Sequence, residues 1–190
     1  MTKYRTYLLI STVLFILLQA AIMFGLIGKG YPEFTRSVAV TTSLWIVYTF
    51  IEVKYNAYMN HYVRAAAMTA ITIDAFFGYY LAFYLTSFTF DKLLHAFGTY
   101  AFALFAYVLV VQLLKFPAGG LFKFILATSL GLSIGAFYEI IEFLMDTFSN
   151  PIIPSQVNLL DTDLDIVCDA IGAIIAGLHA ARKTFINENF

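Results

Sequence analysis

Six long apolar stretches limit how this chain can fold more than any other feature of its sequence. They approach the length needed to cross a hydrocarbon core about 30 Å thick, and unpaired backbone groups are so costly in lipid that such segments must be helical. Of the 190 residues, 61% are hydrophobic and only 12% are charged, about half the charge of a typical soluble domain. We therefore predict an all-α, polytopic integral membrane protein, a bundle of six transmembrane helices forming a single domain over residues 1–190. The predicted spans cover about residues 7–27, 38–53, 65–90, 92–114, 122–145 and 164–181.

The rest of the composition excludes several classes of protein. The single cysteine, Cys168, lies inside the last span, so the chain has neither a disulfide framework nor a cysteine-based metal motif. A net charge of −1 gives no reason to expect nucleic acid as a partner. The first apolar run is longer than a signal-peptide core and no small-x-small cleavage site follows it, so we interpret it as a span. The partner that the sequence does indicate is the lipid bilayer, and the oligomeric state stays open.

Basic residues predict how the chain is oriented in the cell membrane. With six spans, eight of them fall on the N-terminal side and three on the opposite side. Since cytoplasmic loops carry the excess of lysine and arginine, both termini are predicted to be cytoplasmic. The eight are Lys3, Arg5, Lys54, Arg64, Lys115, Lys123, Arg182 and Lys183, and the three are Lys29, Arg36 and Lys92.

Ionisable residues gather at the outward ends of the last three spans. On each predicted helix they are three or four residues apart and so share one face. Glycines continue two of these faces, at Gly131, Gly135 and Gly172, and small residues let membrane helices approach closely. We expect an outward-facing cavity lined by carboxylates and an imidazole. Its residues are Asp91 and His95 in the fourth span, Glu139 and Glu142 in the fifth, and Asp161, Asp165 and Asp169 in the sixth.

Such a cluster needs a counter-charge, which a divalent cation, protons, water or a basic residue such as Lys92 could supply. Carboxylates with one histidine suit Mg²⁺, Mn²⁺, Ca²⁺, Fe²⁺ or Zn²⁺. We predict His95, Glu139 and Asp165 as metal ligands, with Asp91 as a further candidate. Glu142 or Asp169 would act as general base or support the ligands. At the outer leaflet, the substrate would be a lipid or a lipid-linked headgroup, such as a cell-envelope precursor.

Other interpretations of the same acids stay open. Asp161 could be a solvated residue at a helix N-terminus. Asp74, near the middle of the third span, is either a buried hydrogen-bonded acid or part of a proton path. The protein could thus be an enzyme, a proton- or cation-coupled transporter, or a non-catalytic membrane partner whose acids only organise the bundle.

Three segments resemble the VanZ-like superfamily of small membrane proteins. They are "DKLLHAFGTYAFAL", "GAFYEIIEFLMD" and "LLDTDLDIVCDAIGAIIAG", and they cover about half the chain, from Asp91 to Gly177. Within that superfamily they look most like the uncharacterised YjdF-like branch, although Phe143 stands where we associate a tryptophan with that branch. The resemblance implies a role in the cell envelope, and it places Asp91, His95, Glu139, Glu142, Asp165 and Asp169 at motif positions.

Overall fold

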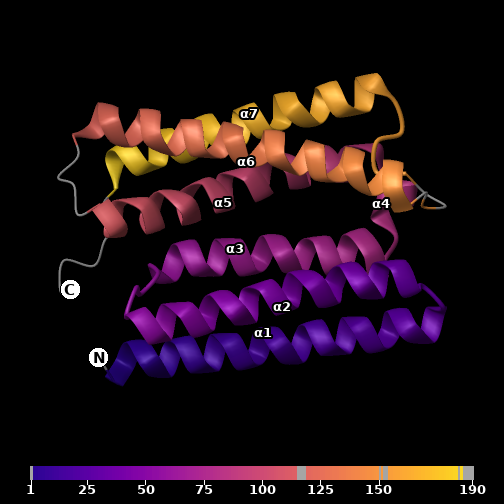
Figure 1. Ribbon diagram of the computed structural model, residues 1–190, viewed down its shortest axis with the longest axis horizontal. Coiled ribbons are helices and arrows are strands. Elements are labelled where there is room, and N and C mark those ends of the chain that lie inside the picture. The colour runs from indigo at the N-terminus through magenta and orange to yellow at the C-terminus, as the bar shows by residue number, and fades with distance from the viewer. Residues whose placement is uncertain (1, 115–118, 150, 152–153, 184, 186–190) are drawn as a thin grey trace. The chain divides into compact units, whose positions relative to one another are not determined.

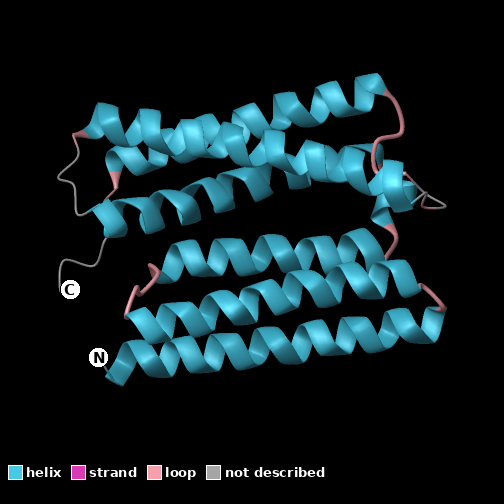
Figure 2. Ribbon diagram, in the orientation of Figure 1, coloured by secondary structure: helices cyan, strands magenta, loops and turns pink. Residues whose placement is uncertain are grey.

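The computed structural model describes residues 2–114, 119–149, 151, 154–183 and 185. Within these ranges the chain is helical and contains no strand (Figures 1 and 2), which confirms the predicted all-α class. Five of the described helices are long and apolar enough to cross a membrane: α1, α2, α5, α6 and α7. The elements are α1 (Thr2–Lys29), α2 (Pro32–Tyr55), α3 (His61–Ile73), the π-helix η1 (Asp74–Tyr80), α4 (Phe83–Thr86), α5 (Phe88–Leu114), α6 (Gly120–Ser149) and α7 (Leu159–Arg182).

Two features of the predicted orientation lie outside the described residues. They are Lys115, one of the basic residues counted above, and part of the connection between the fifth and sixth spans, at residues 150 and 152–153. The orientation itself stays a prediction.

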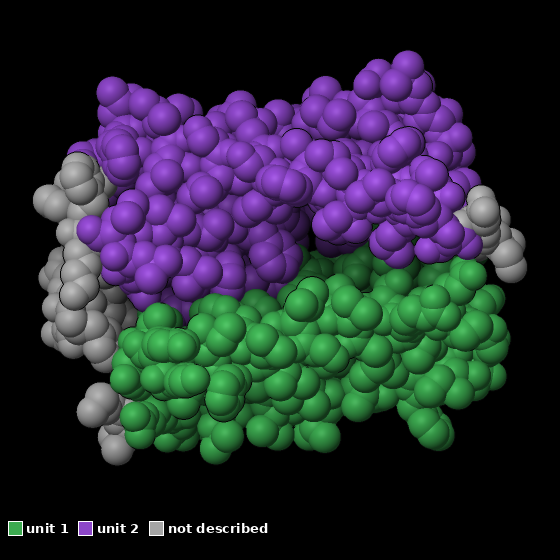
Figure 3. Space-filling model, viewed as in Figure 1, with its two compact units in different colours: residues 1–58, 68–87 green, residues 59–67, 88–190 purple. Residues whose placement is uncertain are grey.

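The chain forms two compact units, coloured separately in Figure 3. Unit 1 comprises Met1–Tyr58 and Met68–Ser87, and unit 2 comprises Met59–Ala67 and Phe88–Phe190. In unit 1, α1 packs against α2 and η1, and the buried core contains Ile22, Leu26, Val38 and Ala75.

The third predicted span, residues 65–90, differs from the structure at its end. Helical backbone runs through α3 and η1 but stops at Tyr80, and Ala82 takes a left-handed conformation with φ of 59°. After the turn, the Tyr84 hydroxyl donates a hydrogen bond back to Asp74 Oδ1 at 2.5 Å, and Gly78 leaves room for the Tyr84 ring. Asp74 is thus hydrogen-bonded at a half-buried position, and its part in a proton path stays a prediction.

In unit 2, α5, α6 and α7 each pack against the other two, and the three lie together in Figure 1. Glycines allow the close approach that the sequence predicted. A Cβ atom built on Gly131 would lie 2.6 Å from the Cβ of Ala173 on α7, and one on Gly135 would lie 2.6 Å from the Cβ of Asp169. Bulkier residues at these crossings would push α6 away from α7, so the glycines determine how near the acids of the two helices come.

Candidate functional site

The ionisable residues predicted from the sequence meet in unit 2, at the start of α5, the end of α6 and the start of α7. Most of their side chains are buried among one another; the predicted outward-facing cavity stays a prediction. We call this group the acid–histidine cluster. Its buried members are Lys92, His95, Glu139, Asp161, Asp165 and Asp169, and its half-buried members are Asp91 and Glu142.

Lys92 is bound by three carboxylates of the cluster. Its ammonium group donates to Asp91 Oδ2 at 3.1 Å and to Asp165 Oδ2 at 2.8 Å, and it also donates to Asp161 Oδ1. An ammonium has three N–H donors, so these three acceptors use all of them. Asp161 is therefore an ion-pair partner of Lys92, whereas the N-cap of α7 is Asn158.

His95 is oriented by Asp169 on α7. Its Nδ1 atom lies 3.3 Å from Asp169 Oδ1 and 3.4 Å from Oδ2, and Thr99 Oγ1 donates to Asp169 Oδ1 at 2.5 Å. Because a carboxylate only accepts hydrogen bonds, the proton of this pair belongs on Nδ1. The lone pair of the neutral imidazole is then on Nε2, on the other side of the ring.

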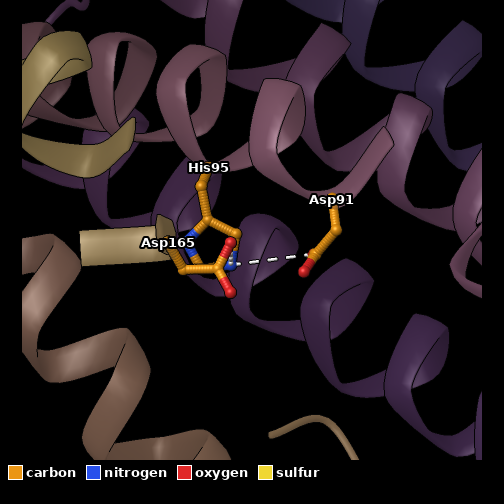
Figure 4. A group of neighbouring side chains, drawn as sticks. All are labelled: Asp91, His95 and Asp165. Atoms are coloured by element: carbon orange, nitrogen blue, oxygen red, sulfur yellow. Dashed lines mark ion pairs between the residues drawn. The ribbon is translucent and has the colours of Figure 1, made fainter. Parts of the chain in front are cut away.

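Two carboxylate oxygens face His95 Nε2. Asp91 Oδ1 lies 3.7 Å from it and Asp165 Oδ1 lies 3.8 Å from it, and Figure 4 shows the polar ends of these three side chains turned toward one another. Asp165 Oδ1 is buried and accepts no hydrogen bond from any residue that the structure describes. Asp91, His95 and Asp165 each offer one ligand atom within 4.8 Å of those of the other two. Three acceptors converge here, an arrangement that needs a proton or a cation among them.

Glu139 and Glu142 form a second possible ligand group with His95, again within 4.8 Å. Glu139 Oε1 lies 3.7 Å from His95 Nδ1, while its Oε2 accepts a hydrogen bond from Gln156 Nε2 at 2.9 Å. The sequence predicted His95, Glu139 and Asp165 as one ligand set. In the structure they divide, because Glu139 faces Nδ1 of the imidazole and Asp165 faces Nε2.

Sequence reasoning missed two polar neighbours of the cluster. Thr99 lies four residues after His95, so its helical spacing was a usable signal. Gln156 lies in the connection between α6 and α7, where no periodicity indicates which side chain turns inward.

The Asp146 carboxylate fixes that connection. Its oxygens accept hydrogen bonds from the backbone N–H groups of Ser155, at 2.9 Å, and Gln156, at 2.8 Å. We expect Asp146→Ala to destabilise the protein by about 1 kcal/mol, because charged hydrogen bonds to two N–H groups are lost at a half-buried position. Thermal unfolding in detergent would measure the loss. Asp163→Ala, which removes an exposed acid, is the control, and equal stability of the two variants would contradict the prediction.

Comparisons with known proteins place the chain in a family. A family described as "Predicted membrane protein (DUF2238)" matches residues 10–184. An uncharacterised protein of Thermotoga maritima is 31% identical over 119 residues, which cover 60% of this chain and 59% of that relative. The alignment thus spans less than two thirds of the relative's length. No solved structure matches the chain. The family match covers most of the chain and agrees with its apolar helices, so the protein belongs to the DUF2238 family of predicted membrane proteins.

Proposed function

We propose that this membrane protein binds a divalent cation at His95 Nε2, Asp91 Oδ1 and Asp165 Oδ1, and uses it to act on a lipid or a lipid-linked envelope precursor. One observation carries the proposal: Asp91 Oδ1 and Asp165 Oδ1 lie 3.7 and 3.8 Å from His95 Nε2, and Asp165 Oδ1, on the most buried carboxylate, has no hydrogen-bond donor among the described residues.

The surroundings of His95 support a metal ligand. Metal-binding histidines usually donate their second ring N–H to a carboxylate, which orients the ring and raises its basicity, and Asp169 occupies that position. Bonds of about 2.0–2.2 Å to a small divalent ion bring neighbouring ligand atoms to about 3 Å from one another. Each of the two carboxylate oxygens would therefore need to approach His95 Nε2 by less than about 1 Å. The mixed oxygen and nitrogen donors suit the ions named above: Mg²⁺, Mn²⁺, Ca²⁺, Fe²⁺ or Zn²⁺.

A cation at this position could polarise a phosphoryl or carbonyl oxygen, or activate water. Of the two predicted general bases, Asp169 is engaged with His95 and Thr99. Glu142, a half-buried member of the cluster close to His95 and Glu139, is better suited to take a proton. The predicted orientation places the cluster near the outer leaflet, and the resemblance to VanZ-like proteins agrees with a substrate of the cell envelope.

Transport coupled to protons or cations is the second candidate, and one observation favours it. Farther along α5 and α7, the Tyr100 hydroxyl lies 2.8 Å from His179 Nδ1 and 2.6 Å from the Tyr62 hydroxyl. These three groups can pass protons to one another in a part of the helices where the sequence has no acid. Proton flux into proteoliposomes, compared between wild type and Tyr100→Phe, would test this function.

Metal content of the detergent-purified protein tests the main proposal. After incubation with Mn²⁺ and removal of free ion, elemental mass spectrometry is expected to find about one ion per wild-type chain. His95→Ala and Asp165→Ala should lose it, whereas Glu139→Ala should keep it, because Glu139 lies on the Nδ1 side of the ring. Asp163→Ala, which removes an exposed acid of the same helix as Asp165, is the control. Wild-type protein without metal, or variants that stay folded and retain it, would contradict the proposal.

A further inference from the structure

We infer that the Lys92 ammonium is a tethered cation that fills the second of two adjacent cation positions, so that the cluster takes one divalent ion instead of two. The inference rests on the proposed function for the first ion. The second position is defined by the contacts of Lys92 itself.

The two positions share two carboxylates. Asp91 and Asp165 each turn Oδ2 toward Lys92, at 3.1 and 2.8 Å. The same two carboxylates turn Oδ1 toward His95 Nε2. Cations bridged by common carboxylates are the arrangement of two-metal sites. Here one of the two cations is the Lys92 ammonium group, which is covalently attached to α5.

The atoms around the Lys92 ammonium are those that would bind a metal ion. Three carboxylate oxygens from two helices surround the ammonium group, and Asp161 supplies the third. An all-oxygen, anionic set of ligands suits hard cations such as Mg²⁺, Ca²⁺ and Mn²⁺. The Lys92 side chain is only 10% exposed. Its ammonium group therefore occupies a buried position that a free ion, able to exchange with solvent, would otherwise fill.

Charge explains why this position must be filled. Lys92 faces Asp91, Asp161 and Asp165, and removing one partner of a buried ion pair leaves uncompensated charge at high cost. A tethered ammonium cannot dissociate, so these acids keep a counter-charge whether or not a divalent ion is bound beside them. Without Lys92, the same three carboxylates would face one another and attract a replacement ion.

Lys92→Met tests the inference, with Lys54→Met at an exposed lysine of unit 1 as the matched control. Both variants and wild type are incubated with Mn²⁺, and bound ions are counted by elemental mass spectrometry. Lys92→Met is expected to bind one ion more per chain than wild type, and Lys54→Met the same number. Added Mn²⁺ should also raise the unfolding temperature of Lys92→Met more than that of wild type. In Lys92→Met with Asp161→Asn, which lacks one of the three anionic oxygens, the additional ion should bind at least about 10-fold more weakly.

Should Lys92→Met fail to fold, Lys92→Gln carries the test. Its amide keeps hydrogen bonds to the carboxylates while leaving their charge uncompensated, and the additional ion is expected there too. A folded Lys92 variant with the wild-type number of ions, and no added response of stability to Mn²⁺, would overturn the inference.

The counts also separate this inference from the proposed function. One ion in wild type and one in Lys92→Met would uphold the proposed function and reject the role of Lys92. No ion in wild type but one in Lys92→Met would reject the proposed function and uphold the role of Lys92. No ion in either would reject both.

Discussion

Gly172→Ala is expected to destabilise the protein strongly, because the new methyl group meets the backbone of α5. The new Cβ would overlap the Ala96 carbonyl oxygen of α5, and it would lie 3.0 Å from the Ala96 carbonyl carbon and 3.1 Å from the Tyr100 backbone nitrogen. These are backbone atoms, so no side-chain rotation can relieve the clash and α5 must move away from α7. Overpacking of this kind costs about 3 kcal/mol.

The shift would also disturb the acid–histidine cluster. Lys92 and His95 on α5 contact Asp165 and Asp169 on α7 within two turns of Gly172, so Gly172→Ala should weaken metal binding as well as stability. Thermal unfolding in detergent and a Mn²⁺ titration measure the two effects.

Gly98→Ala is the matched control for Gly172→Ala. A Cβ atom at Gly98, on α5, meets no atom within 4 Å among the described residues. Alanine is also the better helix former by about 1 kcal/mol, so this variant should be as stable as wild type or slightly more stable. Equal unfolding temperatures for Gly172→Ala and Gly98→Ala would show that α5 and α7 do not approach as closely as described.

Asp169→Asn is expected to weaken binding of the divalent cation by about 10- to 100-fold, the usual effect of losing the partner of a metal-binding histidine. The amide can donate a hydrogen bond to Nδ1 of His95, which moves the ring proton to Nε2. Nε2 then has no lone pair to offer beside Asp91 and Asp165. Asparagine has nearly the same shape as aspartate, so the fold should persist, and titration of the metal-free protein with Mn²⁺ would measure the affinity.

Thr99→Val calibrates the Asp169→Asn experiment. It removes one hydrogen bond to the Asp169 carboxylate while keeping the carboxylate and its charge, so affinity should fall only a few-fold, in line with about 1 kcal/mol for one hydrogen bond.

Wild-type affinity in a folded Asp169→Asn variant would mean that His95 does not bind the ion through Nε2.

The helical class and most helix positions follow from the sequence alone. Lipid tolerates only backbone that satisfies its own hydrogen bonds, so the apolar runs coincide with α1, α2, α5, α6 and α7, each end lying within six residues of the predicted one. In the third predicted span, helical backbone stops at Tyr80. The hydrogen bond that the Tyr84 hydroxyl donates to Asp74 beyond this point leaves no trace in hydropathy.

The members of the cluster were also predictable, because helical spacing aligns Asp91 with His95 and Asp161 with Asp165 and Asp169. Which members contact one another could not be predicted. Lys92 contacts acids 69 and 73 residues away, and whether Glu139 or Asp165 faces Nε2 of His95 depends on how α5, α6 and α7 rotate and cross. The sequence by itself therefore determined which residues lie on each helix face, since that is local geometry. Only the tertiary structure decided which atoms meet, since that depends on side-chain packing between helices far apart in the chain.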